Sequence, residues 1–229
     1  MNSGMFLLLL TGLTLCMSDV TKQEESSDLA IKETQGQLNL VWMAILYPHI
    51  YEHLYEGNWT YATCEVTPSA HLEAGKPQVT GRVLFKQIYP HGKLEAIFYL
   101  DGFPTGTDLN GRAIHIHQFG DLSRGCDSTG GHYNPFQVYH PHHPGDFGNF
   151  YPKDGQIRTL MTNLQATLFG AQAVLGRSVV IHENEDDMGK GNNAASLESG
   201  NSGKRLACCV IGYCKKELWE KAYAELLQI

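Results

Sequence analysis

The sequence predicts an all-β domain with long loops. Glycine is frequent, with 24 residues among 229, charged residues make up only 18%, and the middle of the chain has no long helical pattern. This balance is typical of domains built from short strands and turns. The length suits one such core with an extension at each end. The net charge of -7 indicates no general attraction to nucleic acid or to acidic membrane surfaces.

Short apolar segments separated by Gly, Pro, Asn and Asp predict the strands of this domain. The two longest interruptions, residues 120–154 and 184–204, are rich in turn residues or histidine. Loops of this length inside a compact domain are usually functional, so we expect the site to lie on them. The clearest predicted strands are residues 79–88, 93–100, 112–119, 157–168, 178–183 and 205–211.

Residues 1–18 predict a secretory signal peptide. They contain an apolar run from Phe6 to Leu10, which is too short to span a membrane, followed by small residues. No Lys or Arg precedes the run, and a short membrane anchor is the weaker alternative. Asn58-Trp59-Thr60 is an N-glycosylation sequon that fits the secretory route. The sequence therefore predicts a secreted, extracellular protein without a membrane span and with a glycosylation site at Asn58.

Two extensions flank the β domain, which we place at residues 59–213. Residues 19–58 form a polar acidic arm and then an amphipathic helix, whose apolar side chains recur at helical spacing from Leu38 to Leu46. This helix could pack on its own domain or form a subunit interface, because an apolar stripe indicates burial without naming the partner. Residues 214–229 predict a second amphipathic helix.

Histidines are concentrated in two segments. His115 and His117 alternate with isoleucines in a predicted strand, so that both imidazoles lie on one face. Four of the eleven histidines lie between His132 and His143, in a proline-containing loop that ends at Asp146. Such a loop supplies nitrogen and oxygen ligands at low ordering cost and predicts a tetrahedral zinc site. A solvated loop with adventitious metal affinity is the alternative.

Several spaced motifs extend this pattern over most of residues 61–212. They are His115-Ile-His117-Gln-Phe-Gly-Asp, Gly125-Cys126, His132-Tyr-Asn-Pro, His140-Pro-His-His143-Pro-Gly-Asp146-Phe-Gly-Asn, Val180-Ile-His182-Glu, Asp186-Asp187-Met-Gly-Lys-Gly and Gly203-Lys-Arg205-Leu-Ala-Cys208. With these motifs the chain resembles the copper/zinc superoxide dismutase family, and most of all its extracellular branch. The resemblance implies a Greek-key antiparallel β-sandwich or flattened barrel with long metal-binding and electrostatic loops. It also implies an enzyme that converts two superoxide anions and two protons to O2 and hydrogen peroxide, by alternating copper reduction and oxidation.

The resemblance also implies two metal sites in this chain. It assigns copper to His115, His117, His132 and His182, and zinc to His132, His140, His143 and Asp146. His132 thus bridges the two metals. For His142 the resemblance prefers the neighbouring histidines as zinc ligands, and the alternative to ligation is an exposed side chain that points away from zinc. The chemistry agrees, because zinc lacks the second oxidation state that dismutation needs, whereas four imidazoles suit copper and the hard carboxylate of Asp146 suits zinc.

Three further roles follow from the resemblance. Both ring nitrogens of His132 must be unprotonated to bridge two metals, so that one of them can take up a proton when copper is reduced. Asp186 is implied to join one ligand imidazole of each metal by hydrogen bonds, which fixes their tautomers. Arg205 is implied to guide and orient superoxide at the copper pocket, and we expect Lys190 and Lys204 to support it.

Five cysteines remain if the signal peptide is removed, and this odd number leaves one thiol over. Cys208 and Cys209 are adjacent on a predicted strand, so their side chains point to opposite faces and need separate partners. The resemblance implies disulfides between Cys126 and Cys208 and between Cys64 and Cys209. Cys214 is then a free thiol or an intersubunit link.

Other classes of function fit less well. A binding module that had lost the chemistry should lack copper ligands or Arg205, and a copper-delivery protein should add a Cys-rich transfer motif. A two-metal hydrolase should offer more carboxylates. The resemblance to extracellular family members implies a homo-oligomer, either a dimer or a tetramer. Such members often carry a basic heparin-binding tail. Here glutamates match the lysines after Cys214, so heparin binding is not expected.

Overall fold

The structure, a computed structural model, describes residues 27–28, 30–36, 38, 42, 59–89, 92–106 and 110–228. The chain divides into two compact units, residues 1–56 and 57–229, and the second holds the β domain. The elements of the second unit are β1 (Trp59–Pro68), β2 (Thr80–Ile88), β3 (Leu94–Asp101), β4 (Arg112–His117), β5 (Ser123–Cys126), η1 (Asp127–Thr129), β6 (Asp146–Phe150), β7 (Gln156–Leu164), β8 (Ser178–His182), α3 (Ala194–Ser199), β9 (Arg205–Val210), β10 (Gly212–Tyr213) and α4 (Lys216–Leu226).

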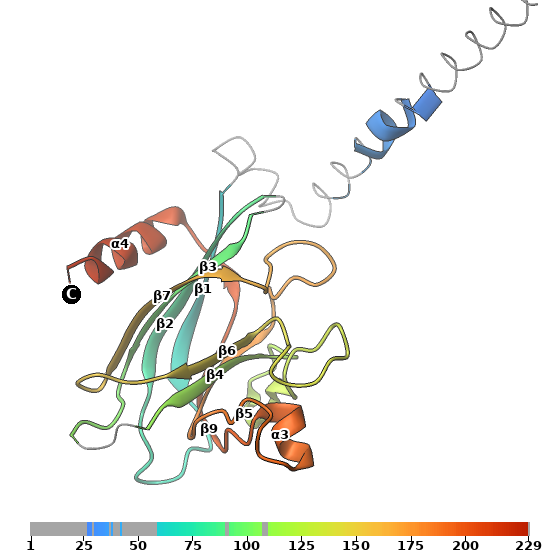
Figure 1. Cartoon of the computed structure of the whole chain (residues 1–229). Helices are drawn as coiled ribbons and strands as arrows, with labels where there is room; N and C mark the ends of the chain where they lie inside the picture. The colour runs from blue at the N-terminus through green and yellow to red at the C-terminus, as the bar shows by residue number, and fades with distance from the viewer. Residues whose placement is uncertain are drawn as a thin grey trace, which may run out of the picture. The chain divides into compact units, whose positions relative to one another are not determined.

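Among the described residues, nine strands form one sheet that folds over into two halves (Figure 1). The strand order is β6-β4-β8-β9-β1-β2-β3-β7, and β10 also pairs with β1. The end of β1, at Thr67 and Pro68, pairs with β9, whereas most of the strand pairs antiparallel with β2, so β1 joins the two halves. This order is not sequential and requires connections that cross between the halves. The predicted all-β sandwich or flattened barrel is therefore confirmed.

Apolar side chains fill the space between the two halves. Phe98 of β3 contacts Phe147 and Phe150 of β6, with ring centroids 5.4 and 4.5 Å apart. Ile114 and Ile116 of β4 are fully buried, as alternation in the strand requires. Burial of each side chain of this size contributes about 1.5–3 kcal/mol. The same alternation turns the intervening histidines of β4 to the opposite face, under the long loops.

The C-terminal helix α4 covers the outer face of β2 and β3 (Figure 1). Trp219 and Ala222 of α4 form one buried cluster with Leu84 and Ile97, which are cross-strand partners in the sheet. Both faces of this part of the sheet are thus buried. The predicted amphipathic tail packs on its own chain because β2 and β3 carry apolar residues on both faces.

Two disulfides fix β9 to its surroundings. Cys64 of β1 is bonded to Cys209, and Cys126 of β5 is bonded to Cys208. These are the pairs that the resemblance implies. Each closes a long loop and can stabilise the fold by about 2–4 kcal/mol. The second one also ties the start of the histidine-bearing loop to β9.

Cys214 is a free thiol, partly buried beside α4. Burial raises its pKa to about 11. Only the thiolate reacts with iodoacetamide, so at pH 8 we expect Cys214 to be alkylated roughly 100-fold more slowly than a peptide thiol of ordinary pKa. The rate should rise as the pH approaches 11, and in guanidinium the thiol should react normally. Peptide mass spectrometry measures this, and fast labelling at pH 8 would contradict it. An intersubunit disulfide would instead block labelling in guanidinium as well.

The structure adds elements that the sequence pattern did not predict. β5, η1, β6 and α3 lie inside the two segments that we predicted as loops, and residues 30–36 are helical where we predicted a polar arm. The helix formers at Ala30 to Glu33 favour this helix, and Thr34 Oγ1 donates to the Ala30 carbonyl oxygen. Residues 1–18, Asn58 and most of residues 38–46 lie outside the described residues. No helix within the described part is long and apolar enough to cross a membrane.

Candidate metal centre

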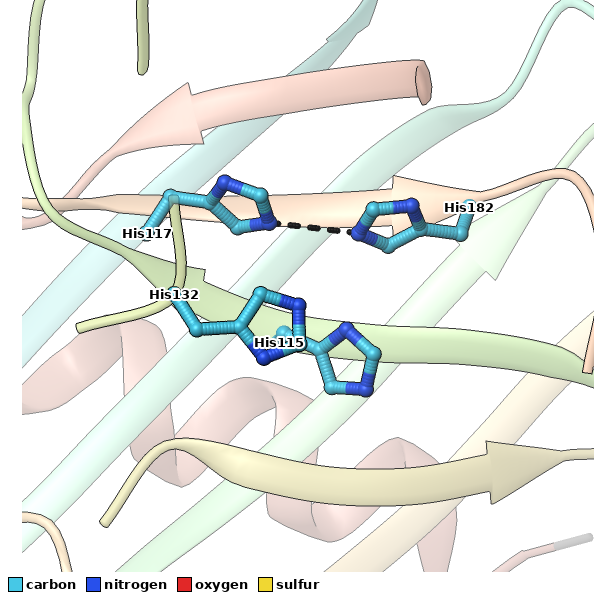
Figure 2. Close-up of side chains that lie close together, drawn as sticks. All are labelled: His115, His117, His132 and His182. Carbon is cyan, nitrogen blue, oxygen red and sulfur yellow. Dashed lines mark hydrogen bonds between the residues drawn. The ribbon is translucent and has the colours of Figure 1, made fainter. Parts of the chain in front are cut away.

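Two groups of metal-ligating side chains meet on the outer face of β4. We call them the four-histidine group, made of His115, His117, His132 and His182, and the Asp146 group, made of His132, His140, His143 and Asp146. In each group the ligand atoms, one from each residue, lie within 4.8 Å of one another. The rings of the four-histidine group converge, with His117 and His182 facing each other (Figure 2). His132 belongs to both groups.

Strand register assembles the four-histidine group. β4 pairs with β8, and this places His182 at the end of β8 beside the two histidines of β4. The rings of His115 and His182 have centroids 5.0 Å apart. The loop returns along β4, where His132 forms an isolated antiparallel bridge with His117 and Tyr133 N donates to the Ile116 carbonyl oxygen. Histidines up to 67 positions apart in the chain (182 − 115 = 67) are thereby brought to one point.

Hydrogen bonds select the tautomer of five of these histidines. His117 Nδ1 lies 2.8 Å from Gly130 O, His182 Nδ1 lies 3.3 Å from Gly203 O, and His143 Nε2 lies 3.1 Å from Val138 O. His115 Nε2 and His140 Nε2 lie 2.9 and 2.7 Å from the carboxylate of Asp186. Carbonyl and carboxylate oxygens only accept, so each of these nitrogens donates a proton. In the neutral, metal-binding form of each ring, the other nitrogen presents a bare lone pair.

The bare nitrogens show whether metal ions would fit between these side chains. Four of them, His115 Nδ1, His132 Nε2, His140 Nδ1 and His143 Nδ1, are buried without a hydrogen-bond partner. His117 Nε2 and His182 Nε2 face each other at 3.2 Å (Figure 2). A buried polar atom without a partner costs about 1–3 kcal/mol, and a cation among these lone pairs removes that cost. Four imidazoles suit copper, and three imidazoles with one carboxylate suit zinc, so the residues fit both metals.

The two groups differ in charge. Burial and the neighbouring histidines hold the pKa of His117 and of His182 well below 6.5, and Arg205 acts in the same direction. Both are therefore neutral at pH 7, the form that ligates a metal. Burial opposes ionisation of Asp146, but the hydrogen-bonded ring of His132 and the close rings of His140 and His143 keep its pKa well below 3.8. Asp146 is therefore ionised at pH 7, and against the effect of burial the carboxylates of Asp146 and Asp186 raise the pKa of His140 to about 9.

Asp186 connects the two groups through His115 and His140. Its backbone is held by Asn149, whose side chain accepts from Asp186 N at 2.7 Å and donates to Asp186 O at 2.8 Å. Gly200, with φ of 67°, lies against the Asp186 carboxylate, and a Cβ there would clash with it. The carboxylate therefore has one position, from which it orients one ring of each group.

Arg205 lies at the start of β9 beside the four-histidine group. Its guanidinium donates to three backbone carbonyl oxygens and to Thr129 Oγ1. Lys204 forms an ion pair with Glu73, which offsets the positive charge that we expected it to contribute. Lys190 is exposed. A recess of about 560 Å³ reaches His132 and His143 between the histidine loop and α3, where Leu197 and Glu198 line it.

Known proteins are similar in sequence to this chain across the β domain. A model of the copper/zinc superoxide dismutase family matches residues 79–211. The chain belongs to this family. The predicted family, the enzyme class and the use of copper and zinc are thereby confirmed.

Individual relatives extend the match beyond the β domain. Extracellular superoxide dismutase [Cu-Zn] of Homo sapiens is 46% identical over 221 residues, which cover 96% of this chain and 90% of the relative. The extracellular enzyme of Oryctolagus cuniculus is 48% identical over 195 residues, covering 85% and 80%. Superoxide dismutase [Cu-Zn] of Schizosaccharomyces pombe is 42% identical over 146 residues, covering 60% and 92%. The similarity to the two extracellular enzymes thus reaches beyond the span shared with the fission-yeast enzyme.

The structure brings the seven predicted metal-ligating residues and Asp186 together at this centre, and His142 is exposed outside both groups. Sequence reasoning missed the partners that orient them. The carbonyl oxygens of Val138, Gly130 and Gly203 carry no signal in residue type, because every residue has a carbonyl. Asn149 does carry a signal, since it ends the motif that begins at His140.

Proposed function

We propose that the chain is a secreted superoxide dismutase in which the four-histidine group binds copper and the Asp146 group binds zinc. The shared ring of His132 carries this proposal. Its Nδ1 lies 3.0 Å from Asp146 Oδ1, whereas its Nε2 is buried toward the four-histidine group without a partner. The two nitrogens of this one imidazole therefore face the two groups. Similarity to extracellular superoxide dismutases supports secretion.

Copper, when bound, supplies the one-electron redox chemistry by which superoxide is converted to O2 and hydrogen peroxide. The residues of the chain hold the metals, orient the ligand rings and the substrate, and supply a proton. Asp186 keeps a proton on the Nε2 atoms of His115 and His140, so that their Nδ1 atoms stay free for ligation. His132 Nε2 can accept a proton and pass it to the reduced substrate. Arg205 holds the anion next to this nitrogen.

Metal analysis coupled to a superoxide-consumption assay tests this function. We expect the purified secreted protein to contain one copper and one zinc per chain, and to lose activity when copper alone is removed. Full activity after copper removal, or a protein with both metals and no superoxide consumption, would overturn the proposal.

Charge reversal at Arg205 tests its role. We expect Arg205→Glu to keep copper but to lower the rate several-fold at low ionic strength, and to weaken or invert the salt dependence, because attraction of the anion becomes repulsion. Lys216→Glu on α4 makes the same change in net charge away from the site and is the matched control. A rate equal to the parent's at low ionic strength would refute steering by Arg205.

We also propose the processing and assembly of the chain. Removal of residues 1–18, glycosylation at Asn58 and a homo-oligomer, either dimer or tetramer, are consistent with a secreted enzyme. Leu38 and Trp42, which are helical and expose 54% and 52% of their surface, support assembly. N-terminal sequencing, glycosidase treatment and sedimentation analysis of the secreted protein test the three proposals separately.

Heparin should bind weakly or not at all. Lys215, Lys216 and Lys221 are matched by nearby glutamates, and Lys221 lies 4.0 Å from Glu225. Such a mixed-charge surface gives a sulfated chain little net attraction. Elution from a heparin column near low salt is expected. Retention beyond physiological salt that is lost on truncation after Cys214 would show the opposite.

A further inference from the structure

We propose that Thr129 is a positioning residue for Arg205, and that its hydroxyl fixes the orientation in which the guanidinium meets the anionic substrate. Thr129 ends η1 and is completely buried. The inference rests on the proposed role of Arg205 in guiding superoxide. Guiding the substrate requires a fixed orientation of the Arg205 guanidinium, and the inference names the group that fixes it.

The hydroxyl of Thr129 has defined donor and acceptor roles. Thr129 Oγ1 donates its hydrogen to the Cys126 carbonyl oxygen at 2.8 Å. The same oxygen can therefore only accept from Arg205 Nη1, which lies 2.9 Å away. Hydrogen bonds from a charged donor are stronger than those between neutral groups, and the rigid guanidinium fork transmits the constraint to its other N–H groups.

The other hydrogen bonds from the guanidinium to described residues go to backbone oxygens. Arg205 Nη1 also donates to Cys126 O at 2.8 Å and, at the longer distance of 3.3 Å, to Asp127 O, and Nη2 donates to Gly130 O at 2.7 Å. Thr129 Oγ1 is thus the side-chain acceptor among these contacts, and a substitution can remove it without changing the backbone. Nη1 has two hydrogens for these three acceptors, and Cys126 O and the hydroxyl, at 2.8 and 2.9 Å, are the two nearer ones.

The same short segment also orients a ring of the four-histidine group. The carbonyl oxygen of Gly130, the residue after Thr129, accepts from both Arg205 Nη2 and His117 Nδ1, at 2.7 and 2.8 Å. The Cys126–Cys208 disulfide ties the beginning of this segment to β9, the strand that carries Arg205. The guanidinium and His117 therefore share one rigid frame, and Thr129 Oγ1 sets the angle of the guanidinium within it.

A purely structural role for Thr129 predicts a different outcome. Its carbonyl oxygen accepts from Phe119 N at 2.9 Å, and this backbone contact survives any side-chain substitution. Valine has nearly the same shape as threonine but removes the acceptor at 2.9 Å, so that the second hydrogen of Arg205 Nη1 is left with the more distant Asp127 O at 3.3 Å. We expect the guanidinium then to turn away from the frame, with both metals still bound.

The test compares Thr129→Val, Thr129→Ser and Ser128→Ala as holoenzymes loaded with copper and zinc. Ser128 is the adjacent residue on η1, and its hydroxyl shares its one hydrogen between Asp121 O at 2.9 Å and Gly125 O at 3.1 Å, away from Arg205. We expect Thr129→Val to lower kcat/KM at low ionic strength by roughly 3- to 10-fold, the range for loss of one hydrogen bond. Its salt dependence should weaken, and azide, a small monovalent anion, should bind less tightly. Thr129→Ser should recover most of the rate, and Ser128→Ala should match the parent.

Copper content and the copper EPR spectrum should be unchanged in Thr129→Val. Loss of copper, an altered spectrum, equal losses in Thr129→Val and Thr129→Ser, or a rate and azide affinity equal to the parent's would each overturn the inference.

The variant Arg205→Lys separates this inference from the function on which it rests. Lysine lacks the fork, so in its presence Thr129→Val should cause no further loss of rate. An additive loss in the double variant would overturn the inference even if each single variant behaves as expected. If Arg205→Lys and Arg205→Glu both keep the parent rate, the role of Arg205 itself fails, whatever Thr129 does.

Discussion

Replacement of His182 by alanine should remove dismutation while the protein stays folded. His182 Nε2 presents a bare lone pair to the four-histidine group, and its Nδ1 donates to the Gly203 carbonyl oxygen. Loss of an outer partner of a ligand typically costs 10- to 100-fold, so loss of the ligand itself should lower activity by more than about 100-fold. Copper content should fall and zinc content should persist, because His182 is not part of the Asp146 group. Metal analysis and the superoxide assay measure both effects.

His142→Ala is the matched control for this change. It also removes one imidazole, but His142 is exposed and lies outside both groups. We expect the control to keep both metals and the parent rate. Activity that survives in His182→Ala with copper absent would sink the assignment of the four-histidine group to copper.

Replacement of Asp146 by alanine should act on zinc and on stability. The Asp146 carboxylate lies 2.9 to 3.0 Å from the Nδ1 atoms of His132, His140 and His143. It also accepts from His143 N, which closes the end of the loop. Removal takes away a ligand and the group that holds the other three, so zinc affinity should fall by more than about 100-fold. A ligand present at 100 times its Kd stabilises the fold by about 2.7 kcal/mol, and at least this much should be lost.

Zinc content and thermal unfolding measure this effect, with and without chelator. The parent should lose stability when zinc is chelated, whereas Asp146→Ala should respond little because its zinc is already weakly held. Asp146→Asn keeps the shape and removes the charge, and it separates the ligand from the packing contribution. If zinc content and stability were both unaffected in Asp146→Ala, His142 would become the candidate ligand.

Much of the fold could be predicted because turn residues separate its strands. Six predicted strands correspond to β2, β3, β4, β7, β8 and β9, since Gly, Pro and Asn bound each apolar run. β6 was missed because Asp146-Phe-Gly-Asn reads as a turn, and only its pairing with β4 makes it a strand. The choice of partner for the C-terminal helix could not be predicted either. It depends on the outward apolar residues Leu84 and Ile97, which a single strand pattern does not distinguish from core residues.

The metal ligands could be predicted because they are side chains of particular residue types, which are visible in the sequence. Histidine and aspartate at fixed spacing indicate ligands, and the structure brings these residues into two groups. Tautomer and orientation depend on backbone carbonyl oxygens such as Gly130 O, which leave no trace in the sequence. The ion pair of Lys204 with Glu73 joins two exposed residues far apart in the chain, so the sequence alone does not predict that their charges offset each other.

The position of α4 restricts how copies of the chain can associate. Trp219 and Ala222 occupy the outer face of β2 and β3, so a second subunit cannot dock there unless the helix is displaced. Displacement would expose a tryptophan and a pair of aliphatic side chains together, and each would lose the contacts that bury it. The surface left for association is therefore the remainder of the domain and the N-terminal unit. A variant lacking α4 should consequently self-associate through a face that the complete chain keeps closed.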